Sequence, residues 1–120
     1  MQNESVETDN MKAMLLRIYM SENDTHMGKS AHHAVLEFLK RKGIAGATVH
    51  HCIEGYGVHD RIHTASVLRL GTDLPVIIQA VDREERIRGI IPELRRMLPG
   101  KVMIIENVEI VSGERFTGKA

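Results

Sequence analysis

The sequence of 120 residues predicts an α+β domain in which two helices cover one face of a four-stranded antiparallel sheet. Two segments, at about 30–42 and 83–98, place apolar residues three and four positions apart, as helices do. Strand patterns surround these segments and complete the order βαββαβ. This order is that of the ferredoxin-like arrangement, so we expect a ferredoxin-like sandwich.

The first strand is predicted over residues 14–20, where side chains alternate between two faces. One face carries Met14, Leu16, Ile18 and Met20, and the other carries Leu15, Arg17 and Tyr19. A polar loop follows over residues 21–28.

The first helix is predicted to begin at about Ser30, with a stripe of Ala31, Ala34, Val35, Phe38 and Leu39. Three cations at 40–42 fall in its last turn, where they suit the helix dipole. Gly43 is well placed to take the left-handed conformation that ends many helices.

The second strand is predicted over 47–54, and a polar loop leads from it into a return strand over 64–70. A turn or bulge at 71–75 precedes a strongly apolar strand at 76–81. Gly55 and Gly57 let the main chain turn sharply or approach a ligand closely, because no Cβ intervenes. We therefore expect any binding site to lie beside this loop.

The second helix is predicted to begin with a capping box in which Asp82 is the cap and Glu85 its partner. Its apolar stripe is Ile87, Ile90, Ile91, Leu94 and Leu98. Pro92 conflicts with the pattern, since proline removes one backbone hydrogen bond, but we predict that the helix continues to Pro99. The last strand begins at 102–105 and extends toward Val111.

Three of the predicted strands are apolar on both faces. Two helices can cover only one face of the sheet, and soluble monomers seldom leave large apolar patches open. The sequence therefore predicts an oligomer.

The composition predicts one cytoplasmic domain over 12–113, with a disordered segment at 1–11 and a tail at 114–120. The formal net charge is zero and only four residues are Phe or Tyr, so we expect no nucleic-acid binding. Cys52 is the only cysteine, which rules out an intrachain disulfide. No apolar run reaches the roughly 20 residues of a membrane span.

The chain resembles the PII signalling proteins, and most closely a PII-like group known as domain-of-unknown-function family 190. The resemblance covers about residues 13–112. It rests on the segments Leu16-Arg-Ile-Tyr19, Gly43-Ile-Ala-Gly-Ala-Thr-Val49, Gly55-Tyr-Gly57, Arg61-Ile-His-Thr-Ala-Ser66, Asp73-Leu-Pro-Val76 and Glu106-Asn-Val-Glu-Ile110.

The resemblance implies a homotrimer that binds nucleotides in clefts between subunits, near the base of a loop matching residues 57–63 here. PII proteins bind phosphates partly with a glycine-rich loop before the last strand. In this chain, Lys101 alone could take the place of that loop's phosphate-binding residues. PII proteins also carry two arginines in a segment where this chain has Glu109 and Val111. Because this chain lacks the two arginines and carries a carboxylate instead, we expect it to bind ATP more weakly than PII proteins do. The expected position of the cleft is unchanged.

The candidate ligand-binding residues are Lys29, Thr48, Gly55, Gly57, Arg61, His63, Thr64, Ser66 and Lys101. Arg61 could hold a phosphate or carboxylate with two hydrogen bonds, and Lys29 could meet an anion at a helix start. Each residue also has a purely structural interpretation: a turn glycine, a strand threonine, a solvated loop or a surface lysine.

Seven histidines invite a metal hypothesis, but none of the pairs has the i, i+4 helical spacing of a zinc motif. His50 shares a strand face with Cys52, which could begin a site completed across subunits. We expect structural or exposed histidines and assign no metal site. A CutA-like divalent-metal trimer using His50, His59 or His63 remains the alternative.

The sequence shows no catalytic motif: it has no nucleophile elbow, no Walker loop and no pairing of acidic residues that suggests acid–base catalysis. We therefore expect no enzyme and name no cofactor. The sequence favours a PII-like regulator that binds a small anionic effector, with a nucleotide as one candidate, and presents residues 57–63 to a partner protein. An adaptor without a ligand is a further alternative.

Overall fold

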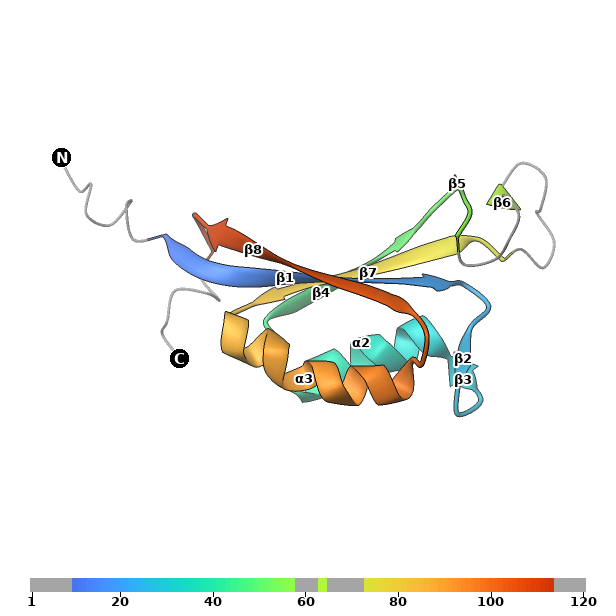
Figure 1. Cartoon of the computed structure of the whole chain (residues 1–120), viewed down its shortest axis with the longest axis horizontal. Coiled ribbons are helices and arrows are strands. Elements are labelled where there is room, and N and C mark those ends of the chain that lie inside the picture. The colour runs from blue at the N-terminus through green and yellow to red at the C-terminus, as the bar shows by residue number, and fades with distance from the viewer. Residues whose placement is uncertain (1–9, 58–62, 65–72, 114–120) are drawn as a thin grey trace.

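The computed structural model describes residues 10–57, 63–64 and 73–113. A four-stranded antiparallel sheet forms its centre, in the order β4-β7-β1-β8 (Figure 1). Its strands are β1 (Met11–Ser21), β4 (Gly46–His51), β7 (Pro75–Asp82) and β8 (Val102–Ile110). The sheet order and the two helices confirm the predicted ferredoxin-like fold.

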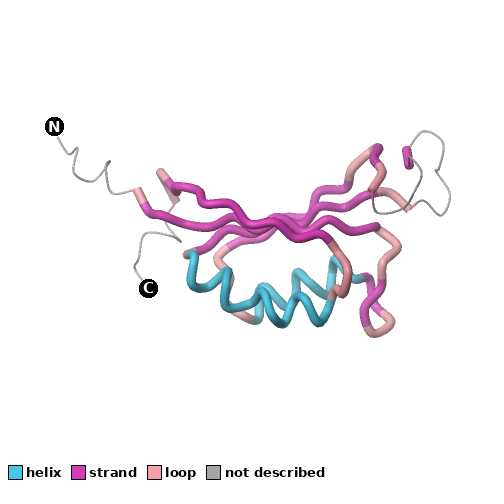
Figure 2. The backbone as a smooth tube through the Cα atoms, viewed as in Figure 1, coloured by secondary structure: helices cyan, strands magenta, loops and turns pink. Residues whose placement is uncertain are grey.

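Two helices, α2 (Ala31–Arg41) and α3 (Glu84–Met97), lie on the same face of this sheet (Figure 2). Two short hairpins extend from one end of it (Figure 1). The hairpin of β2 (Thr25–His26) and β3 (Lys29–Ser30) lies on the helix side, and it begins in the predicted loop 21–28 and extends two residues beyond it. The hairpin of β5 (Glu54–Gly55) and β6 (His63–Thr64) rises on the other side.

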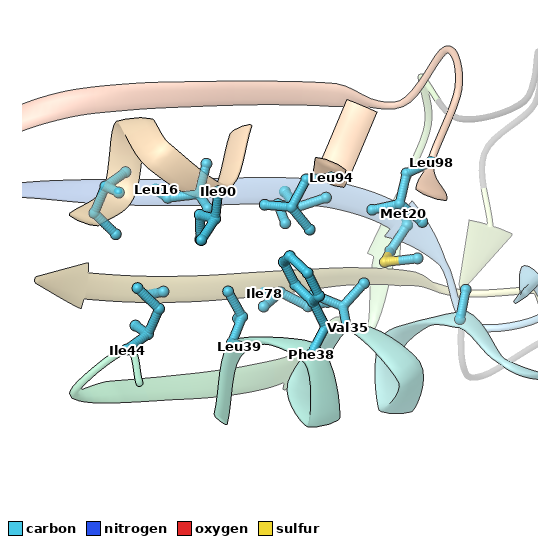
Figure 3. Packing of buried hydrophobic residues seen from close by; sticks show 14 of the residues in the cluster. Leu16, Met20, Val35, Phe38, Leu39, Ile44, Ile78, Ile90, Leu94 and Leu98 are labelled. Atoms are coloured by element: carbon cyan, nitrogen blue, oxygen red, sulfur yellow. The ribbon is translucent and has the colours of Figure 1, made fainter. Parts of the chain in front are cut away.

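The core lies between the sheet and the helices, and aliphatic side chains make up most of it (Figure 3). Leu16, Ile18 and Ile78 of the sheet are fully buried against Phe38 of α2 and Leu94 of α3. The predicted stripes of both helices face this core, although Ala34 and Ile91 are only partly buried. Neither α2 nor α3, the two described helices, is long and apolar enough to cross a membrane.

Helix α2 is terminated at Gly43, as predicted. Gly43 has a φ of 81°, and its N–H donates to the Lys40 carbonyl at 3.1 Å. The N–H of Ile44 donates to the Leu39 carbonyl at 3.1 Å, and the Ile44 side chain is buried. These two bonds and the apolar residue after the glycine define a Schellman motif.

The start of α3 differs from the prediction. The N-cap is Arg83, and it has no side-chain capping bond. Asp82 instead ends β7, where it is buried; its Oδ2 accepts a hydrogen bond from Ala45 N at 2.8 Å and its Oδ1 one from Arg83 N at 2.6 Å. The capping prediction was wrong because the Asp82 carboxylate joins the turn after α2 to the end of β7. The predicted continuation of the helix through Pro92 is confirmed.

The strand boundaries shift near the predicted loop. β4 ends at His51 instead of near Glu54, and the chain then bends before β5. Of the predicted return strand 64–70, only Thr64 lies among the described residues, where it pairs with Glu54. Residues 65–70 lie outside the described residues.

The face of the sheet opposite the helices is not covered by any element within the described residues (Figure 2). The register places Leu15 beside Val81, and Tyr19 beside Ile77 and Val102, on this open face. At its centre, Arg17 donates to Gln79 Oε1 at 3.3 Å and to Glu106 Oε1 at 3.2 Å. The open face therefore carries apolar side chains of β1, β7 and β8 around the hydrogen-bonded Arg17–Glu106 pair, and polar side chains of β4 at its edge.

Candidate functional site

A cleft of about 420 Å³ lies at the end of the sheet from which the two hairpins extend. The end of β1, the beginnings of β7 and β8, and the β5 segment form its walls. The lining residues are Tyr19, Met20, Cys52, Glu54, Gly55, Tyr56, Gly57, Pro75, Val76, Ile77, Gly100, Lys101 and Val102. Ligand pockets typically measure about 300–1,000 Å³, so the cleft is large enough for a small ligand.

The glycine segment is held against the start of β7. A Cβ added at Gly55 would lie 2.8 Å from Pro75 Cγ, so the backbone approaches the proline more closely than a larger residue allows. Cys52 N donates to the Pro75 carbonyl at 3.0 Å and fixes the chain where it leaves β4. Gly57 has a φ of 118°, a conformation that favours glycine. Both predicted glycines thus have a structural reason to be glycine as well as a place in the cleft.

Lys101 reaches the cleft from the turn between α3 and β8. Its Nζ lies 2.9 Å from Asp24 Oδ2, and the same oxygen accepts a hydrogen bond from Ser21 N at 2.8 Å. The Lys101 N–H donates to the Leu98 carbonyl at 3.2 Å, and Gly100 turns the chain with a φ of 82°. The lysine is therefore a positioned cation whose charge Asp24 already balances in part.

The structure brings together three of the predicted residues, Gly55, Gly57 and Lys101, although more than 40 positions separate the glycines from the lysine. His63 and Thr64 pair through their backbones with Gly55 and Glu54 and so lie beside the cleft in the chain path. Arg61 and Ser66 lie outside the described residues, and their roles stay predictions.

The other two predicted residues are not among those lining this cleft. Thr48 is exposed on the open face of β4, opposite Gln79. Lys29 lies in β3 with its side chain 67% exposed, and its Nζ is 3.9 Å from Glu37 Oε1. The first N–H of α2, that of Ala31, already donates to the Asp24 carbonyl at 2.8 Å.

The aromatic part of the cleft was not predicted from the sequence. Tyr19 belongs to the open face of β1, and Tyr56, which is 76% exposed, stands between the two glycines. The signal in the sequence was a tyrosine flanked by two glycines, two residues beyond the predicted strand 47–54. Tyr19 could not be assigned without the pairing that places β1 next to β7 and β8.

The histidines are distributed over several surfaces. Among residues 10–57, 63–64 and 73–113, no group of three or more His, Cys, Asp or Glu side chains is arranged to hold a metal ion. His33 Nε2 lies 3.4 Å from Glu37 Oε2 on α2. The rings of His32 and His51 contact each other edge to face, with centres 5.4 Å apart. Burial and the neighbouring His51 lower the pKa of His32. His59 lies outside the described residues.

The fold and the cleft define a PII-like α+β domain. The family model of DUF190, described as "Uncharacterized ACR, COG1993", matches residues 13–110. The chain therefore belongs to the DUF190 family, as the sequence motifs predicted. The UPF0166 protein MJ1524 of Methanocaldococcus jannaschii is 37% identical over 107 residues, which cover 88% of this chain and 98% of the relative.

Solved structures with the same fold include PII-like proteins. CPII of Thiomonas intermedia K12, solved bound to ADP, AMP and bicarbonate, matches with a TM-score of 0.62 and 17% identity over 90% of this chain and 96% of its own. A PII-like signalling protein of Thermus thermophilus matches with a TM-score of 0.64 and 20% identity over 91% and 99%. The divalent ion tolerance protein CutA1 of Ehrlichia chaffeensis shares the fold with a TM-score of 0.54 and 14% identity over 85% and 84%. At these identities the matches define the fold.

Proposed function

We propose that this chain is a PII-like regulatory protein that binds a small anionic effector in the cleft at the sheet end. Our first candidate is an adenine nucleotide with one or two phosphates. The observation that carries the proposal is the meeting of Gly55, Gly57 and Lys101 in one cleft beside two tyrosines.

The lining suits the two parts of a nucleotide. Tyr19, Tyr56 and the apolar residues Ile77 and Val102 offer flat and apolar surface to a base. Backbone N–H groups near Gly55 and Gly57 and the Lys101 ammonium offer hydrogen bonds and charge to an anion. CPII, which shares the fold, carries ADP and AMP, and this supports the same ligand class here.

The charge of the cleft favours a ligand with few phosphates. Lys101 is the only cation among the described lining residues, Asp24 pairs with it, and Glu54 adds a carboxylate. Glu109 and Val111, which stand where PII proteins carry arginines, lie at the far end of β8, and Glu109 pairs with Lys12 of β1 in the sheet. A triphosphate would therefore meet too little positive charge within one chain.

A homotrimer would complete the cleft. Tyr19, Ile77 and Val102 line the cleft and also belong to the open face of the sheet. A second copy packed on that face would cover its apolar side chains and supply another cleft wall. This arrangement agrees with the intersubunit sites that the family resemblance implies.

The effector would act through residues 57–63. Gly57 lines the cleft, and His63 pairs with Gly55, so both ends of this segment are tied to the binding site. Binding would change which surface the segment presents to a partner protein, without chemistry on the ligand.

The test is thermal unfolding of metal-stripped protein with nucleotides, simple anions and divalent metals. A ligand at 100 times its Kd adds about 2.7 kcal/mol of stability. AMP or ADP should raise the melting temperature more than ATP. Arg61→Ala and Lys101→Ala should each weaken binding by about 1–3 kcal/mol, because each removes a charged hydrogen bond.

Arg96→Ala and Lys40→Ala are matched controls, since both residues are exposed and lie outside the cleft. Equal loss in the controls would contradict the proposed site. A response only to transition metals would favour the CutA-like function, and no response to any ligand would favour an adaptor.

A further inference from the structure

Two histidines from different elements meet beside the helical layer, away from the lining of the cleft. His32 belongs to the first turn of α2, and His51 is the last residue of β4. Their ring centres are 5.4 Å apart and the ring planes make an angle of 86°. The contact therefore joins the start of a helix to the end of an edge strand.

The backbone of each element fixes its histidine. Along β4, Ala47 and Val49 pack against the core, and His51 has the same parity, so it lies on the helix-covered face. His51 pairs with Val76 of β7 through the sheet. His32 follows Ala31, which is buried. The two rings thus approach each other from well-packed elements.

The spacing of the rings suits a shared metal ion. Imidazole nitrogens bind Zn²⁺ at about 2.0–2.1 Å, and two such rings at a tetrahedral angle have centres about 5 Å apart. The observed distance of 5.4 Å between the ring centres is close to that value, and a small rotation of the side chains would remove the difference. Histidine is a favoured ligand of Zn²⁺, Ni²⁺ and Cu²⁺.

The pair is open to solvent, because His51 is exposed and His32 is half-buried. No third protein ligand stands with the pair in the described residues, so water would fill the remaining positions.

We propose that His32 and His51 form a two-histidine site for a divalent transition metal. The inference goes beyond the effector cleft, because neither histidine lines it. A bound ion would link α2 to the end of β4, one residue before Cys52 enters the cleft wall.

The chain supplies matched controls, because each proposed ligand has an adjacent histidine that points elsewhere. His33 lies near Glu37 on another side of α2, and His50 lies on the opposite face of β4. The variants His32→Ala/His51→Ala and His33→Ala/His50→Ala remove the same number of histidines from the same two elements.

Untagged, metal-stripped full-length protein is titrated with NiCl₂ by calorimetry, and circular dichroism checks the fold of each variant. Wild type and the His33→Ala/His50→Ala control should bind one more ion per chain than His32→Ala/His51→Ala, with at least a tenfold difference in Kd for that ion. CuCl₂ should give an electron paramagnetic resonance spectrum with coupling to two imidazole nitrogens, lost only in His32→Ala/His51→Ala.

Equal binding by wild type and His32→Ala/His51→Ala would overturn the proposal, as would loss of the ion in the control. No nickel uptake by wild type would also overturn it. The single variants His32→Gln and His51→Gln keep side-chain bulk. Each should abolish binding of the same ion, because both rings are proposed ligands.

Discussion

The two faces of the sheet are built from the same strands but meet different environments. In β1, Leu16 and Ile18 are 0% exposed under the helices, whereas Leu15, Arg17 and Tyr19 on the other face are only partly buried. In β8, Val102 and Ile104 of the open face are 61% and 39% exposed. Under the helices the apolar side chains of β1 and β7 are buried within one chain, although Ile105 of the edge strand β8 is 39% exposed on that face. The apolar side chains of the open face have no such cover within the described residues.

The charged groups of the two faces differ in the same way. On the covered face, Asp82 is 3% exposed and accepts hydrogen bonds from two backbone N–H groups. On the open face, Arg17 is paired with side chains only, and water still reaches it. The covered face therefore stabilises the chain, whereas the open face is suited to an interface, where such a charge pair would favour one register of association.

The largest expected effect is on the covered face. Phe38→Ala should lower the free energy of unfolding by about 3–5 kcal/mol, because it removes a fully buried ring from between the sheet and α2. Urea denaturation at one fixed protein concentration measures the loss. A loss below about 1 kcal/mol would mean that the two layers do not pack as described.

Asp82→Ala should have the next largest effect. The change leaves the N–H of Ala45 without its acceptor in a part-buried position, and we expect a loss of about 1–3 kcal/mol. Glu85→Ala is the control, because the predicted capping bond is not formed and Glu85 is exposed. If Glu85→Ala proved the more destabilising change, the assignment of Asp82 as the joining carboxylate would be wrong.

Ile104→Glu should change chain stability least, within about 0.5 kcal/mol, since Ile104 is exposed and stands opposite Arg17. The same substitution would place a charge in the proposed trimer interface. Sedimentation equilibrium should therefore show a trimer for the wild type and smaller species for the variant, with unchanged circular dichroism. A trimer that tolerates the substitution would remove the open face from the interface.

Much of the fold could be predicted because its signals are local. The apolar stripes of both helices, the stop at Gly43 and the alternation of β1 depend on spacing along the chain, and each appears in the structure. The cap of α3 failed because Asp82 bonds to Ala45, 37 positions away, and no local pattern reports such a partner.

The order of residues alone predicts where the chain turns, and it predicts a sheet with apolar side chains on both faces. It also pointed to Gly55, Gly57 and Lys101 as ligand residues. The folded arrangement of strands and helices was needed to show that these three share a cleft with Tyr19 and Tyr56, and that His32 contacts His51. The physical reason is that strand and helix periods are properties of neighbouring residues, whereas sheet order and register bring distant residues together.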